Sequence, residues 1–113
     1  MSDEHTKTGE IRSKTQMLLA VDDFMNDMIR KLVANEDKGH WSEVTQWYLL
    51  SRLNDELTEL SDAMIKGAAI KPVSDANKLS QAIIDECADV SNFCMFIADN
   101  ERKRMEVSNV DGN

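Results

Sequence analysis

Residues 50–64 read LSRLNDELTELSDAM, a stretch in which leucine or methionine recurs at steps of 3, 4, 3 and 4 residues. This spacing places the apolar side chains on one face of an α-helix, because each helical turn takes 3.6 residues. The resulting stripe consists of Leu50, Leu53, Leu57, Leu60 and Met64. We therefore predict a long amphipathic helix that begins at Ser42, a favourable N-cap, and ends at Lys66-Gly67 with glycine as a left-handed stop.

Two further segments share this period. Residues 13–35 form one helix, and a third helix begins between Ser74 and Ser80 and frays at Asn100–Arg104. Their stripes are Leu18, Val21, Met25, Met28 and Leu32, and Ile83, Cys87, Val90, Cys94 and Ile97. Because the connections are short and no segment has the pattern of a strand, the sequence predicts an all-α fold, an antiparallel helical bundle.

The expected domain organisation is a flexible N-terminal segment at 1–12, a helical domain at 13–100 and a polar C-terminal tail at 101–113. A chain of 113 residues buries a modest share of its surface, and its three apolar stripes are wide. We therefore expect oligomerisation to complete the bundle, as a homodimer or a dimer of dimers.

Charge and composition exclude several classes of function. Lys and Arg total 13 against 21 Asp and Glu, a net charge of −8 that repels a nucleic-acid backbone, so no nucleic-acid polymer is expected as a partner. The four glycines are too far apart to form a phosphate-binding loop. The longest apolar run, 93–98, is too short to span a membrane, and the polar first residues lack a secretory signal. These features predict a cytoplasmic protein without a membrane partner.

Two pairs of acidic residues stand at matching positions on the second and third predicted helices. Glu56 and Glu59 each precede a stripe residue, and so do Glu86 and Asp89. Residues three apart share a helix face, so the two pairs can converge on one point. Converging carboxylates repel one another unless a cation neutralises them, and carboxylate oxygens favour Mg²⁺, with Mn²⁺ as the second candidate. The alternative is that both pairs lie on the solvated faces of two acidic helices.

These residues resemble a known family. Glu56-Leu57-Thr58-Glu59, a spacer of 26 residues and Glu86-Cys87-Ala88-Asp89 resemble the ExxE…ExxD signature of the MazG-like all-α nucleoside triphosphate pyrophosphohydrolases. The resemblance implies hydrolysis of a nucleoside or deoxynucleoside triphosphate to the monophosphate and pyrophosphate. It also implies a role in clearing the nucleotide pool. Mg²⁺ would be held by the carboxylates of Glu56, Glu59, Glu86 and Asp89, and the general base would be Glu59 or Asp55.

Other residues are candidates for substrate binding. Lys38, His40 and Trp41 directly precede the second helix, and the resemblance makes the two rings candidate contacts for the nucleobase. Alternatively, Trp41 only packs onto the bundle. Asn92 lies one turn beyond Asp89 and has an amide that can donate to phosphate. Arg102, Lys103 and Arg104 are phosphate-binding candidates or, alternatively, a solvated helix end.

A second class of function fits the same sequence. A non-enzymatic helical module would oligomerise through its stripes, present an acidic surface and need no divalent metal. A metal-binding relative without turnover would bind the cation and hydrolyse nothing. Binding of Mg²⁺ through the four carboxylates, followed by hydrolysis, separates these alternatives.

Overall fold

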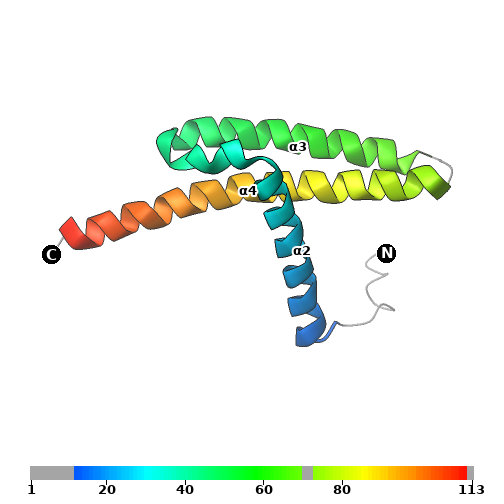
Figure 1. Ribbon diagram of the computed structural model, residues 1–113, viewed down its shortest axis with the longest axis horizontal. Coiled ribbons are helices and arrows are strands. Elements are labelled where there is room, and N and C mark those ends of the chain that lie inside the picture. The colour runs from blue at the N-terminus through cyan, green and yellow to red at the C-terminus, as the bar shows by residue number, and fades with distance from the viewer. Residues whose placement is uncertain (1–11, 70–72, 112–113) are drawn as a thin grey trace, which may run out of the picture.

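The computed structural model describes residues 12–69 and 73–111, and these residues form helices joined by short connections (Figure 1). The helices are α2 (Lys14–Ala34), the 3₁₀ segment η1 (Glu36–Glu43), α3 (Gln46–Ala68) and α4 (Val73–Asp111). No strand occurs within the described ranges. The all-α prediction is therefore confirmed. Most of the N-terminal segment expected to be flexible lies outside the described residues.

Side-chain caps determine where the first helices begin. Ser13 precedes α2 and forms a capping box with Gln16, whose backbone N–H donates to Ser13 Oγ at 3.1 Å. The predicted N-cap Ser42 is wrong, because Thr45 accepts from the Tyr48 backbone N–H at 3.0 Å and α3 starts after it. Ser42 instead lies in η1 beside Trp41, whose ring stacks on Phe96 of α4.

The ends of the two long helices also differ from the prediction. Gly67 lies within α3, and no glycine in the described part of the chain has a positive φ, so the left-handed stop is wrong. A Cβ at Gly67 would lie 3.0 Å from the Ile83 side chain, so this glycine permits a close approach of α3 to α4. The predicted fraying at 100–104 is wrong as well, because α4 continues to Asp111.

The core lies between α3 and α4, which run antiparallel along most of the length of α3 (Figure 1). Leu49 contributes from α3 and Phe93 and Phe96 from α4, all at most 5% exposed. Partly buried residues pack around them, namely Leu32, Trp41, Leu53, Met95 and Ile97. The buried side of α3 therefore passes through Leu49 and Glu56, whereas the predicted stripe residues Leu50, Leu57 and Met64 are 40–55% exposed.

Helix α2 projects away from the α3–α4 pair and contacts it only near its C-terminal end (Figure 1). None of its residues is buried, and its stripe residues Leu18, Val21 and Met25 are 48–61% exposed. The radius of gyration is 18.0 Å, against about 13 Å for a compact chain of this length. The single chain thus leaves two apolar helix faces uncovered. No described helix has the length and apolar character needed to cross a membrane.

Candidate functional site

Three of the four predicted metal-binding carboxylates meet between α3 and α4. One oxygen from each of Glu56, Glu86 and Asp89 lies within 4.8 Å of the others, and we call these three residues the carboxylate cluster. Glu56 is 5% exposed and Asp89 is 9% exposed. Glu86 Oε1 is buried and has no hydrogen-bond partner within the described part of the chain. Buried carboxylates are costly unless their charge is balanced, so this arrangement fits a bound cation.

The electrostatics of Glu86 reflect this crowding. Its pKa is raised, first by burial and then by the negative charges of Glu59, Asp89 and Glu56. Lys31 opposes the shift without cancelling it. Glu59, the fourth predicted ligand, is exposed and lines a shallow cavity together with Glu86. It therefore adjoins the carboxylate cluster on its solvent side.

Two basic residues reach the carboxylate cluster from different helices. Lys31 of α2 places its Nζ 3.5 Å from Asp89 Oδ2, and Arg52 of α3 places a guanidinium nitrogen 3.4 Å from Glu56 Oε2. The sequence analysis missed both. Arg52 stands four residues before Glu56, a spacing that brings two side chains together on a helix and could have indicated the pair. Lys31 has no such signal, because its position depends on how α2 crosses α4.

An aromatic pocket of about 300 Å³ lies one helical turn from the carboxylate cluster. Trp41 stacks on Phe96 with ring centroids 4.4 Å apart, and Phe93 meets Phe96 edge-on at 5.1 Å. The Trp41 indole N–H donates to Asp99 at 3.0 Å, which fixes the ring. The pocket is lined by His40, Trp41, Val44, Tyr48, Leu49, Arg52, Phe93 and Phe96. Its size and apolar walls suit a planar ring with polar edges.

The cluster and the pocket follow from the antiparallel register of the two helices. Glu56 of α3 faces Asp89 of α4 in the cluster. One turn along, Arg52 faces Phe93, with its guanidinium carbon 5.5 Å from the ring centroid. After a further turn, Leu49 packs in the core with the next aromatic residue of α4. Successive turns of the helix pair thus present carboxylates, then a cation on an aromatic ring, then the apolar core.

The remaining predicted residues lie apart from the carboxylate cluster. Asn92 is buried and donates to the backbone oxygen of Met28 at 3.0 Å, so its amide nitrogen joins α4 to α2. Asp55 is exposed and pairs with Arg52 at 3.0 Å. His40 lines the aromatic pocket and lies 3.4 Å from a carboxylate oxygen of Glu43.

Two of the predicted basic residues, Arg102 and Lys103, lie on the C-terminal part of α4. Lys103 pairs with Asp99 at 3.2 Å, and Arg102 is exposed on the same stretch of α4. The side chain of Lys38 lies outside the described residues. Neither Arg102 nor Lys103 is among the residues that line the aromatic pocket, whereas Trp41 and His40 both line it.

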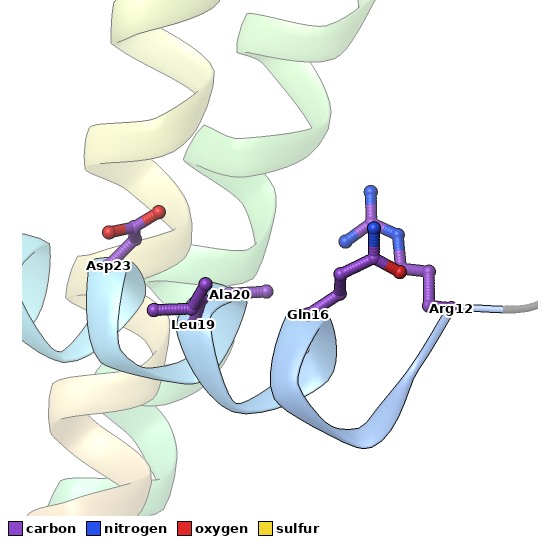
Figure 2. Close-up of a pocket in the computed structure, with 5 residues that line it drawn as sticks. All are labelled: Arg12, Gln16, Leu19, Ala20 and Asp23. Carbon is purple, nitrogen blue, oxygen red and sulfur yellow. The ribbon is translucent and has the colours of Figure 1, made fainter.

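A second hollow lies on α2, distant from these features. Figure 2 shows Arg12, Gln16, Leu19, Ala20 and Asp23 along the first turns of the helix, with the α3 and α4 ribbons behind them. Its volume is about 550 Å³, but all its lining residues come from the start of one helix. An open helix side without facing groups lacks the convergent polar atoms of a small-molecule site.

The chain was compared with protein-family models, with curated proteins and with solved structures. None of these comparisons finds a match to the chain. The functional interpretation therefore depends on the carboxylate cluster, the aromatic pocket next to it and the spacing of the acidic pairs in the sequence.

Proposed function

We propose that the protein is a Mg²⁺-dependent nucleoside triphosphate pyrophosphohydrolase, which converts its substrate to the monophosphate and pyrophosphate. The observation that carries this proposal is the convergence of Glu56, Glu86 and Asp89 within 4.8 Å, one turn from an aromatic pocket. The resemblance of the two acidic pairs to the ExxE…ExxD signature supports the same reaction.

The donor set of the carboxylate cluster fits the cation. All three groups offer carboxylate oxygens, which Mg²⁺ and Mn²⁺ prefer, and the buried Glu86 Oε1 is available to a ligand. A cation held there would supply charge neutralisation for the phosphates and acidification of a bound water. Helices α3 and α4 hold the three carboxylates in place, so little rearrangement is needed on binding.

Glu59 is the better of the two candidates for the general base. It is exposed and lies close enough to Glu86 to raise the pKa of that carboxyl, so it can accept a proton from a water at the cluster's edge. Asp55 is exposed too, but it pairs with Arg52 at 3.0 Å. The guanidinium therefore already occupies one of the two Asp55 oxygens that could receive the proton.

The aromatic pocket is the proposed site for the nucleobase. Trp41 is partly buried and lines the pocket, and bases stack on such aromatic rings irrespective of sequence. The partly polar His40 and Tyr48 stand at the same pocket and offer hydrogen bonds to base edges. Tyr48 was not among the residues that the sequence indicated for substrate binding.

We also propose that the protein forms a homo-oligomer. The exposed apolar faces of α2 and α3 include Leu18, Val21, Met25, Leu57 and Met64. Such faces, left uncovered on an elongated chain, are typical of helices that pack against a second copy. Association alone would equally suit a non-enzymatic module. That alternative gives no reason for three carboxylates to face one another in the interior of the helix pair.

The experiment that tests the function is a hydrolysis panel of canonical and modified nucleoside triphosphates with Mg²⁺. The expected products are a monophosphate and pyrophosphate, separated and identified by ion-exchange chromatography. Release of orthophosphate and a diphosphate would place the cut at another bond and overturn the proposal. Metal binding without hydrolysis of any member of the panel would identify a metal-binding relative that does not turn over.

A further inference from the structure

Arg52 lies between the aromatic pocket and the carboxylate cluster and contacts both. One guanidinium nitrogen is 3.4 Å from Glu56 Oε2, and the other is 3.0 Å from Asp55 Oδ2. The guanidinium carbon stands 5.5 Å from the centroid of the Phe93 ring, and the side chain forms part of the pocket wall. About a third of the side chain is exposed, so it is accessible to a ligand.

No other cation occupies this position among the described residues. Lys31 approaches the carboxylate cluster from α2, pairs with Asp89 and does not line the aromatic pocket. His40 lines the pocket, but its side chain is 75% exposed and lies 3.4 Å from Glu43. A ligand with a ring in the pocket and negative groups at the cluster would therefore extend along the Arg52 side chain.

A cation at the carboxylate cluster would weaken the pairing of Arg52 with Glu56 and leave the guanidinium able to bind another acceptor. A divalent cation at the carboxylate cluster and the guanidinium would compete for the same carboxylate oxygens and repel each other. The stacking contact with Phe93 depends on neither, so the guanidinium can keep its place over the ring while its N–H groups change acceptor. A phosphate offers two oxygens at the spacing of the guanidinium fork.

We propose that Arg52 binds the phosphate chain of a nucleotide, replacing its contact with Glu56 by a contact with phosphate oxygens when the carboxylate cluster holds a cation. This inference rests on the proposed function, since it takes the ring and the phosphates from one molecule. Together with a cation at the carboxylate cluster, Arg52 would then distinguish a nucleotide from the corresponding nucleoside.

The test is equilibrium binding with saturating Mn²⁺, using the α,β-methylene analogues of the four deoxynucleoside triphosphates and the four unphosphorylated deoxynucleosides. Arg52→Gln should weaken binding of the best analogue by about tenfold or more, the size expected for a lost charge-assisted pair. Its affinity for the deoxynucleoside should stay within about twofold of the wild type. Mn²⁺ binding should persist, because the variant removes a competing positive charge.

Two further variants test whether the effect depends on the guanidinium fork and on the position of Arg52. Arg52→Lys keeps the charge but loses the fork, so its loss of analogue affinity should be intermediate. Arg12→Gln removes an exposed arginine just before the start of α2, outside both the pocket and the cluster, and should bind the analogue like the wild type. Circular dichroism establishes that each variant is folded. If Arg52→Gln does not fold, the same comparison is made with Arg52→Lys. A greater loss of affinity for the analogue than for the deoxynucleoside supports the inference, and equal losses overturn it.

The outcomes separate this inference from the proposed function. If Arg52→Gln binds the analogue as tightly as an active wild type, the inference is overturned and the function stands. If the wild type hydrolyses no triphosphate but the variant still loses analogue binding selectively, the function fails and the role of Arg52 holds. Equal losses for analogue and deoxynucleoside would show that Arg52 only shapes the pocket, and a wild type that binds neither would overturn both.

Discussion

Lys31 of α2 and Asp89 of α4 form an ion pair of 3.5 Å. This contact places the ammonium group of Lys31, which comes from the projecting helix α2, beside the carboxylate cluster. Both side chains are largely shielded, at 23% and 12% exposure. The pair therefore has two effects. It helps to hold the end of α2 on α4, and it partly balances the charge of the cluster when no metal is present.

Replacing Lys31 by Met should lower the melting temperature of the metal-free protein by about 4 °C or more, because Asp89 loses its counter-charge. Mg²⁺ should raise the melting temperature of both proteins by binding to the folded state, and by more in the variant. Differential scanning calorimetry with and without Mg²⁺ measures both effects. A wild type whose melting temperature does not respond to Mg²⁺ or Mn²⁺ would count against the metal site.

Glu59→Gln and Glu86→Gln should each reduce hydrolysis on the order of 10²-fold or more, because each removes a charge or a base from the reacting centre. Neither creates a cavity, and Glu86→Gln relieves repulsion at the buried carboxylates, so it should stabilise the metal-free fold. Steady-state rates with identified products test this. Glu43→Gln, an exposed site outside the cluster, is the matched control and should keep the wild-type rate. Wild-type rates in both cluster variants would mean that these residues form only a solvated acidic surface.

Met25→Glu should dissociate the proposed oligomer, because it places a charge in the middle of the exposed apolar stripe of α2. Asn26→Glu adds the same charge at an exposed polar position one residue away and should leave the assembly intact. Light scattering at micromolar concentration measures both. A wild type that is a stable, folded monomer under these conditions would contradict the expectation.

Protonation of Asp99 in acid should weaken the hydrogen bond that its carboxylate accepts from Trp41. Its pKa is lowered, first by the hydrogen bond from Trp41 and then by Lys103. A lowered pKa in the folded state means that the stabilisation is present above the unfolded value, 3.8, and is lost as the pH falls through the folded value. Fluorescence of Trp41 should therefore change below pH 3.8, and the change should be smaller in Asp99→Asn, which keeps an acceptor without the titrating charge. An identical acid response in both proteins would exclude this contribution.

Local sequence signals predicted much of the helical framework. The 3,4 spacing from Leu18 to Leu32 predicted a helix over 13–35, and α2 spans Lys14–Ala34. The spacing of the two acidic pairs indicated that four carboxylates could converge; oxygens of Glu56, Glu86 and Asp89 lie within 4.8 Å of one another, whereas Glu59 is exposed beside them. These signals succeed because they depend on the geometry of one helix and on a short connection between two.

Tertiary contacts account for what the sequence did not predict. Ser42 is as good a cap as Thr45 in isolation, yet Ser42 lies in η1 next to Trp41, which stacks on Phe96, and α3 starts after Thr45. The apolar arc of α3 is broad enough that its spacing alone did not show which edge faces α4, and the structure buries Leu49 and leaves Leu50 40% exposed. The approach of Lys31 likewise depends on the crossing of α2, which no local pattern encodes.

The register of α3 against α4 sets the distance along the helix axis between the carboxylate cluster and the aromatic pocket. The step from the carboxylate cluster to the Arg52–Phe93 level is one turn, a rise of about 5.4 Å that the backbone hydrogen bonds keep constant. For the proposed nucleotide, substitutions in the pocket wall would change which ring fits, but not the distance along the helices from that ring to the carboxylates. The helix pitch would then set the length of ligand that suits the site, and the side chains its shape.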